Sequence, residues 1–219
     1  MFRDRAEAAR QLAARLRDRH WHNLLVLAIP RGGVVTGATL AEELGAELDV
    51  VLARKLAAPG EPELALGAVA EDGSVFLNSL GQEWREELRD YLEAERVRQL
   101  EEIARRRQVY RAVRPPATIQ GRSVVVTDDG IATGATMIAA LQATRGQNPH
   151  ELIVAVPVAP PERLAEVRRW CDETICLLTP ETFWAVGQFY EHFDQVSDEQ
   201  VVELLRHAWA ARTVPTQPS

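Results

Sequence analysis

A short apolar strand that ends in two adjacent acids is the part of this chain best suited to chemistry. The run that begins at Val124 is rich in β-branched residues, which predicts a buried strand. Asp128 and Asp129 follow it directly, and small residues at 132–136 then lead into an apolar helical pattern. Because open α/β sheets bind their ligands at the carboxyl ends of the strands, this order of residues predicts a ligand site.

The residue types in this run suit two different parts of one ligand. Free N–H groups at a helix N-terminus favour an anion such as phosphate. Two carboxylates beside them favour hydroxyl groups or a hydrated cation over a second phosphate. The combination predicts a phosphate next to a diol, as in a ribose 5-phosphate. For each part taken alone, an ordinary strand, turn and helix cap is the alternative.

Composition restricts the class of protein. The 219 residues, 46% of them hydrophobic, suffice for one domain with a normal core. The net charge of −7 and the mixing of acids with bases argue against a nucleic-acid-binding surface. The charged N-terminus does not resemble a signal peptide, and no apolar run is long enough to cross a bilayer. Cys171 and Cys176 form neither a disulfide framework nor a metal site, so a reduced, cytoplasmic compartment is expected.

Lys55 is the only lysine among 25 basic residues. A lysine is a compact point charge, whereas arginine is a planar fork. Its place just after a predicted strand makes it a candidate for binding an anion. A lysine retained by chance is the alternative.

The elements around these residues alternate between apolar strands and amphipathic helices. This alternation predicts an α/β fold with a doubly wound, mainly parallel five-stranded sheet flanked by helices. The predicted strands are 23–29, 48–53, a strand from 124, 151–158 and 173–178. The predicted helices are 3–19, 34–44, 135–145, 160–170 and 198–211.

A long insertion interrupts this alternation. Residues 55–78 contain a predicted β-hairpin around 71–73 and a turn-rich stretch, 57–63, that we expect to be unpacked. An excursion of this length usually forms a lid over a site, although a merely tolerated insertion is the alternative. Residues 79–112 are predicted as one long polar helix, whose apolar stripe packs on the sheet or on another subunit.

The run from Val124 to Thr136 resembles the signature of the type I phosphoribosyltransferases. That signature is an apolar strand, two acids, two variable residues and a small-residue phosphate loop. Gly130 departs from it, because a branched apolar residue is commoner there. The resemblance covers about residues 20–178 and is nearest to uncharacterised bacterial members. It implies one domain over the whole chain, with a flexible β-hairpin lid, the inserted helix and a small hood at 179–195.

The resemblance implies a site for phosphoribosyl pyrophosphate (PRPP). Asp128 and Asp129 would bind the ribose hydroxyls. The phosphate loop would surround the 5-phosphate through Ala132, Thr133, Gly134, Ala135 and Thr136.

A second anion site is implied for the pyrophosphate. Arg31, Gly32 and Gly33 match the family's pyrophosphate loop, where a strained peptide is often found, although Arg-Gly-Gly alone is a weak signal. Arg54 and Lys55, at the end of the second strand, match the basic site for the leaving pyrophosphate. Arg31 and Lys55 are therefore the expected catalytic residues.

The reaction implied is a direct transfer of ribose 5-phosphate to a nitrogenous base or related acceptor. Mg²⁺ would be bound mainly through PRPP oxygens and water, with Asp128 and Asp129 as the nearest protein groups. The five histidines are scattered, so no catalytic histidine is expected. The expected partners are PRPP and a small-molecule acceptor, with neither nucleic acid nor membrane, and a homodimer is common in the family.

Three alternatives remain at this point. A non-catalytic PRPP-binding regulator would have the same donor site, although Arg54, Lys55 and a full-length lid favour an enzyme. A phosphohydrolase on a similar sheet would lack a correctly placed nucleophile. In the hood, Phe183 and Trp184 either stack on a planar acceptor or fill a small satellite core.

Overall fold

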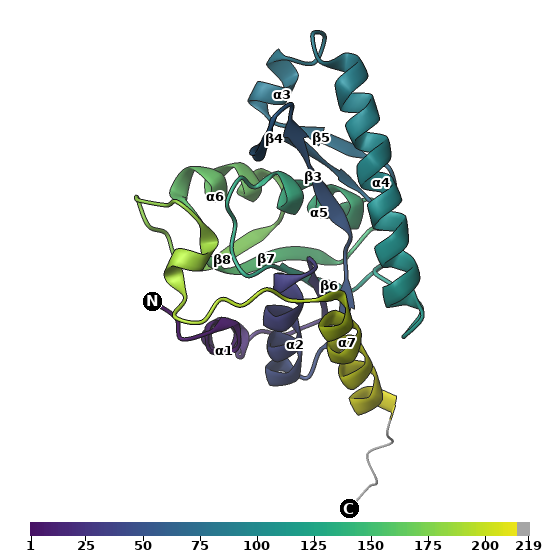
Figure 1. Cartoon of the computed structure of the whole chain (residues 1–219). Coiled ribbons are helices and arrows are strands. Elements are labelled where there is room, and N and C mark those ends of the chain that lie inside the picture. The colour runs from purple at the N-terminus through teal and green to yellow at the C-terminus, as the bar shows by residue number, and fades with distance from the viewer. Residues whose placement is uncertain (214–219) are drawn as a thin grey trace, which may run out of the picture.

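A five-stranded parallel sheet forms the centre of the protein (Figure 1). The computed structural model describes residues 1–213, so the frayed tail expected at 214–219 lies outside the described residues. The strand order β2-β1-β6-β7-β8 confirms the predicted fold class. The strands are β1 (Leu25–Ala28), β2 (Glu47–Val50), β6 (Ser123–Thr127), β7 (Glu151–Val158) and β8 (Glu173–Leu178).

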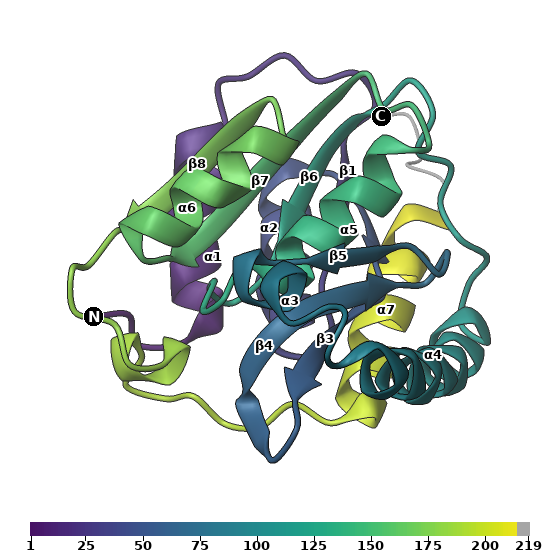
Figure 2. The same cartoon turned by 90° about the horizontal axis from the view of Figure 1, so that it is seen from above.

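Helices cover both faces of this sheet, which is why its strands consist of almost continuous apolar runs. Figure 2 shows α5 and α6 over one face, with α1 and α2 on the other. Two buried clusters, one on each side of the sheet, form the core. The helices are α1 (Arg5–Leu16), α2 (Gly32–Leu44), α5 (Ala135–Arg145), α6 (Pro161–Val167) and α7 (Asp198–Thr213), with short 3₁₀ helices η1 (Arg168–Trp170) and η2 (Val186–Phe189).

The insertion at 55–78 is a packed structure of its own. A small antiparallel sheet contains β3 (Ala53–Ala58), β4 (Glu61–Ala70) and β5 (Val75–Leu77) in that order. The β4–β5 hairpin was predicted and is confirmed. The prediction of an unpacked turn over 57–63 is wrong at both ends. Ala57 and Ala58 belong to β3, where Ala58 is buried, and residues 61–63 begin β4, so that only 59–60 form a turn. The small sheet packs against α5, because apolar residues of β4 join the same core as that helix.

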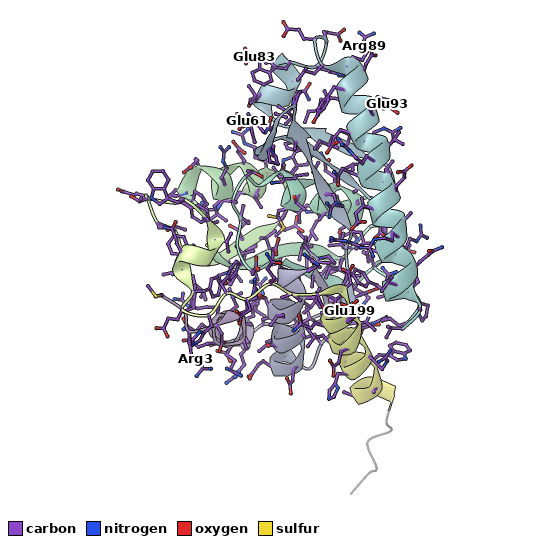
Figure 3. All side chains as sticks on the ribbon, in the orientation of Figure 1. Arg3, Glu61, Glu83, Arg89, Glu93 and Glu199 are labelled. Carbon is purple, nitrogen blue, oxygen red and sulfur yellow. The ribbon has the colours of Figure 1, made fainter. Side chains whose placement is uncertain are left out.

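The prediction of one helix over 79–112 is wrong, because the chain folds back on itself. It forms α3 (Ser79–Glu83), a turn over 84–88, and α4 (Arg89–Arg111). Leu80, Trp84 and Leu88 pack with Leu92 around the buried Leu66 of β4. Their helical spacing is consistent with one straight helix, so only this tertiary contact reveals the break. Figure 3 shows charged side chains on the outer side of α4, such as Glu93, directed to solvent.

The N-terminus and the hood lie side by side. The Phe2 amide donates to the Phe189 carbonyl at 2.7 Å, and the Glu191 amide donates to the Phe2 carbonyl at 2.9 Å. Phe2 and Tyr190 are buried in a satellite core with Phe193 packed against them. The first residues of the chain therefore hold the hood in place.

Candidate active site

The sequence signature folds into the carboxyl edge of the large sheet. Strand β6 is buried along its whole length and ends at Thr127, so Asp128 and Asp129 emerge where the strand leaves the core. Strand β1 pairs directly with β6, and therefore the loop after β1 reaches the same edge. The predicted pyrophosphate loop and the predicted ribose acids are neighbours in space.

Asp128 and Asp129 form a tightly arranged pair. The Asp129 amide donates to Asp128 Oδ1 at 2.8 Å. Burial, and after it the adjacent Asp129 carboxylate, raises the pKa of Asp128 well above its usual range. A carboxyl group in this setting is poised to interact with hydroxyl groups or a cation, either of which would favour its charged form.

Gly32 and Gly33 allow the pyrophosphate loop to approach these acids. A Cβ at Gly32 would lie 2.0 Å from Asp129 Oδ2, and a Cβ at Gly33 would lie 2.7 Å from Asp128 Oδ1. Any side chain at either position would displace the acid pair. Both glycines are thus required by packing as well as by any anion that the loop binds.

Arg31 begins this loop and lies on the surface. A cis peptide bond joins Pro30 and Arg31, at the place where the resemblance implies an unusual peptide. Arg31 is the N-cap residue of α2 and is exposed. Its guanidinium group is therefore accessible to an anion at the start of that helix.

The phosphate loop leads directly into α5. Gly134 is its N-cap residue and has a φ of 81°, a left-handed conformation that glycine adopts without steric cost. The amide groups of the first turn of α5 have no helical carbonyl partners, which makes this N-terminus suitable for a phosphate.

A cavity of about 740 Å³ lies over this loop. Its lining combines the phosphate loop with residues from β3, the start of α6 and the hood. Eight of the predicted site residues line it: Lys55, Asp128, Ala132, Thr133, Gly134, Thr136, Phe183 and Trp184. Asp129, Ala135 and the pyrophosphate loop do not line it, so the cavity gathers part of the predicted set.

The expectation that Arg54 and Lys55 end the second parallel strand is wrong. They lie in β3 of the small sheet, opposite Val69 and Ala68 of β4. Because neighbouring residues of a strand point to opposite faces, only Lys55 lines the cavity. Arg54 points to α4, where its Nε donates to Gln99 Oε1 at 2.5 Å. Burial, and then the charge of Arg106, lowers the pKa of Arg54.

The two aromatic residues of the hood differ in their surroundings. Phe183 is partly buried and packs against Phe189, with 5.2 Å between the ring centroids. Trp184 is 86% exposed, so it does not fill the satellite core. Both line the cavity, which keeps each of them a candidate for stacking on a planar acceptor.

Several residues around the site were not found by sequence reasoning. Arg5 forms an ion pair with Asp129, and the Tyr190 hydroxyl donates to the Asp129 carbonyl at 2.6 Å. Glu162, Arg163 and Glu181 line the cavity. No local pattern marks these residues, because Arg5 and Tyr190 are separated from Asp129 by 124 and 61 positions.

Two of the five histidines contact each other away from this edge. His22 and His150 precede β1 and β7, which puts them at the opposite, amino edge of the sheet, with ring centroids 4.0 Å apart. Among residues 1–213 there is no group of three or more acidic, histidine or cysteine side chains that could hold a metal. Within that same part of the chain, none of the helices combines the length and apolar character needed to cross a bilayer.

Comparison with known proteins gives a consistent result. A family model described as phosphoribosyl transferase domain matches residues 3–194. A Mycobacterium tuberculosis H37Rv protein, provisionally named phosphoribosyl transferase Rv0571c, is 42% identical over 208 residues. The match covers 95% of this chain and 47% of that protein, and a protein of strain CDC 1551 matches equally. The chain thus spans about half the length of these curated relatives.

A crystal structure shows the same fold. The protein TT1426 from Thermus thermophilus superposes with a TM-score of 0.80 and is 44% identical. The match covers 94% of this chain and 98% of that one.

Proposed function

Because the chain belongs to the phosphoribosyl transferase domain family, we propose that it transfers ribose 5-phosphate from PRPP to a nitrogenous base or related acceptor, with release of pyrophosphate. The observation that carries this proposal is that Asp128, the phosphate loop, Lys55 and two hood aromatics line the same cavity. A ribose acid, a phosphate site and a cation beside an aromatic wall are the parts that such a transfer requires.

The donor would bind along the carboxyl edge of the large sheet. The amides of the phosphate loop and the hydroxyls of Thr133 and Thr136 would bind the 5-phosphate. Asp128 would accept hydrogen bonds from the ribose hydroxyls, which are stronger than neutral ones because the acceptor is charged. The pyrophosphate would lie toward Arg31 and the amides that follow it, at the N-terminus of α2.

Catalysis would consist mainly of stabilising charge. When the bond between ribose C1 and pyrophosphate breaks, negative charge grows on the leaving group and positive charge on the sugar. Lys55 and Arg31 would stabilise the pyrophosphate at that moment, and preorganised cations are effective in this role. A direct displacement by an acceptor nitrogen needs no protein nucleophile.

Mg²⁺ fits this site only together with the donor. Asp128 is the member of the acid pair that lines the cavity, and one carboxylate with several retained waters suits Mg²⁺. Bound in this way, Mg²⁺ would neutralise part of the pyrophosphate charge.

The acceptor would lie between the phosphate loop and the hood. Phe183 and Trp184 offer planar surfaces for a ring, and the small sheet would limit the access of water from the side of Lys55. Such exclusion matters because water would otherwise hydrolyse the donor.

The test is to incubate the protein with PRPP, Mg²⁺ and a panel of purines, pyrimidines and small heteroaromatic acids, and to measure pyrophosphate. We expect release that depends on one class of acceptor. PRPP binding without release across the whole panel would instead support a regulatory protein. Absence of PRPP binding would refute both.

Asp128→Asn serves as the matched variant in the binding arm. We expect it to weaken PRPP binding by about 2 kcal/mol, the effect of removing charge-assisted hydrogen bonds. Arg10→Gln, at an exposed position of α1, is the control. Unchanged affinity of the Asp128 variant would refute the ribose assignment.

A further inference from the structure

Arg5 makes three contacts that join separate parts of the site. Its Nε donates to Asp129 Oδ2 at 2.8 Å, and its Nη1 donates to the Asp194 carbonyl at 2.8 Å. Its guanidinium carbon lies 3.8 Å from the centroid of the Phe193 ring. The side chains of Arg5 and Asp129 are only 10% and 14% exposed. This geometry is fixed by several partners, unlike that of a surface ion pair.

The carboxylate, the carbonyl and the amide of Asp129 each have a hydrogen-bond partner. Arg5 binds its carboxylate, Tyr190 donates to its carbonyl, and its own amide donates to Asp128 Oδ1. Gly32 leaves room for the carboxylate on the remaining side. The Asp129 carboxylate is therefore already engaged, whereas Asp128 lines the cavity.

The consequence for Asp128 follows from this arrangement. The amide that orients the Asp128 carboxylate belongs to Asp129, so a shift of Asp129 would move it. Without Arg5, Asp129 would be a poorly exposed charge next to a second carboxylate, and both would reorient to reach solvent or a cation.

We propose that Arg5 is a positioning residue for the ribose of the donor: it fixes Asp129 between the pyrophosphate loop and the hood, and thereby orients Asp128 toward the cavity. The inference rests on the proposed function and divides the work of the two acids. Asp128 contacts the ribose, whereas Asp129 connects Arg5 to Asp128: its carboxylate binds Arg5 and its amide orients the Asp128 carboxylate. The ion pair also links the hood to the donor site, because Arg5 binds Asp194 at the same time.

A purely structural role for Arg5 is the competing explanation, and the two differ in which ligand is affected. A general loss of stability would lower the affinity for every ligand to the same extent. Loss of a positioning residue for ribose would weaken the binding of ribose 5-phosphate. It would leave the binding of inorganic pyrophosphate unchanged, because the expected contacts of pyrophosphate lie at the N-terminus of α2.

The experiment measures the affinity of both probes, each with Mg²⁺, by calorimetry on the full chain. The variants are Arg5→Gln and Arg5→Lys, and Arg10→Gln on the same helix is the control. We expect Arg5→Gln to lower the affinity for ribose 5-phosphate about tenfold, which is the effect of losing one charge-assisted hydrogen bond. Pyrophosphate affinity should stay unchanged. Arg5→Lys should lie between the wild type and Arg5→Gln, because an ammonium group can keep the ion pair but not both directional bonds.

A second variant covers the case in which Arg5→Gln fails to fold. The double variant Arg5→Gln with Asp129→Asn lacks the unpaired charge, so we expect it to fold and to bind ribose 5-phosphate as weakly as Arg5→Gln. Wild-type affinity in the double variant, or an equal loss for both probes in the Arg5 variants, would overturn the inference alone. Absence of ribose 5-phosphate binding by the wild-type protein would overturn the proposed function and, with it, this role of Arg5.

Discussion

Gly32 and Gly33 show how single residues set the geometry of the site. A Gly-Gly pair after a strand is usually interpreted as a flexible turn or an anion loop. Here each glycine also faces one acid of the pair, at distances that exclude any side chain. The same two positions therefore determine the distance between the predicted pyrophosphate loop and the predicted ribose acids.

Lys55 is the residue for which a transition-state role can be separated from simple binding. It lines the cavity from β3, an element separate from the phosphate loop. Lys55→Ala should lower kcat more than it raises the dissociation constant of PRPP, because the leaving group gains charge only as the bond breaks. Steady-state kinetics with equilibrium binding would check this. An equal loss in both would identify Lys55 as an anchor.

Thr36 gives a prediction about stability. Its hydroxyl is buried in α2 and lacks a hydrogen-bond partner among the described residues, whereas the buried Thr144 of α5 donates to the Ala140 carbonyl at 2.7 Å. Thr36→Val should raise the free energy of unfolding by about 1 kcal/mol, because it removes an unsatisfied polar group. Thr144→Val, the matched control, should lower it by about 1 kcal/mol. Urea unfolding measures both, and a loss at both positions would contradict the prediction.

At the scale of elements, the close packing of η2 on the loop accounts for the glycine at position 130. Gly130 departs from the family signature, which commonly has a branched apolar residue there. A Cβ at Gly130 would lie 2.7 Å from Val186 Cγ1 and 3.0 Å from Val158 Cγ1. Val186 of the hood therefore fills the space next to Gly130, and the hood packs onto the loop through this contact.

This packing predicts a coupled pair of substitutions. Gly130→Ala should destabilise the protein by about 1–3 kcal/mol through overpacking, and adding Val186→Ala should recover part of that loss. Gly146→Ala is the control, because its nearest atoms would be 3.6 Å away and its backbone is right-handed helical. Thermal unfolding of the wild type, Gly130→Ala, Val186→Ala and the double variant measures the coupling, with Gly146→Ala beside them as the control. Additive effects would show that Gly130 and Val186 do not share this space.

Helix α4 provides a prediction about pH. Glu102 accepts hydrogen bonds from Arg105 and Arg106 at 2.8 Å, and Arg105 is the main reason that the pKa of Glu102 falls from 4.5 to about 2. A lowered pKa means that the stabilisation is complete above pH 4.5 and is lost as the pH falls toward 2. Glu102→Gln should therefore cost about 1 kcal/mol at neutral pH and less in acid. Urea unfolding between these pH values checks it, and parallel curves would contradict it.

Sequence patterns predicted the elements whose signals are local. The strands of the large sheet, the helix over 135–145 and the β4–β5 hairpin follow from apolar runs and turn residues within a few positions. The break at 84–88 was missed because it depends on Leu66 in another element. Arg54 was assigned to the wrong strand because β2 ends early, at Val50, and the next strand begins at Ala53. The contacts of Arg5 depend on residues far along the chain, so no spacing reveals them.

At the scale of the whole molecule, the proposed donor site joins the predicted pyrophosphate loop, the small sheet and the hood around one sheet edge. A ligand that binds only the folded protein raises its stability by mass action. PRPP with Mg²⁺ at about 100 times its dissociation constant should add roughly 2.7 kcal/mol to the free energy of unfolding. Calorimetric scans would show a higher Tm, and a chelator should remove most of the shift. A shift that persists in the chelator would show that the donor binds without the cation.

The pairing of Phe2 with Phe189 and of Arg5 with Asp194 has a consequence for the order of folding. During synthesis, strand β6, the acids and the phosphate loop leave the ribosome well before residue 194, and so do β1 and β7, the strands that pair with β6. Arg5 is synthesised long before Asp194, so it must wait for almost the entire matched region before its last partner is made. Contacts this distant in sequence form slowly. The proposed site is therefore completed late, when Phe2 and Arg5 contact the hood at Phe189 and Asp194. A nascent chain that stalls before the hood would carry the phosphate loop without these contacts.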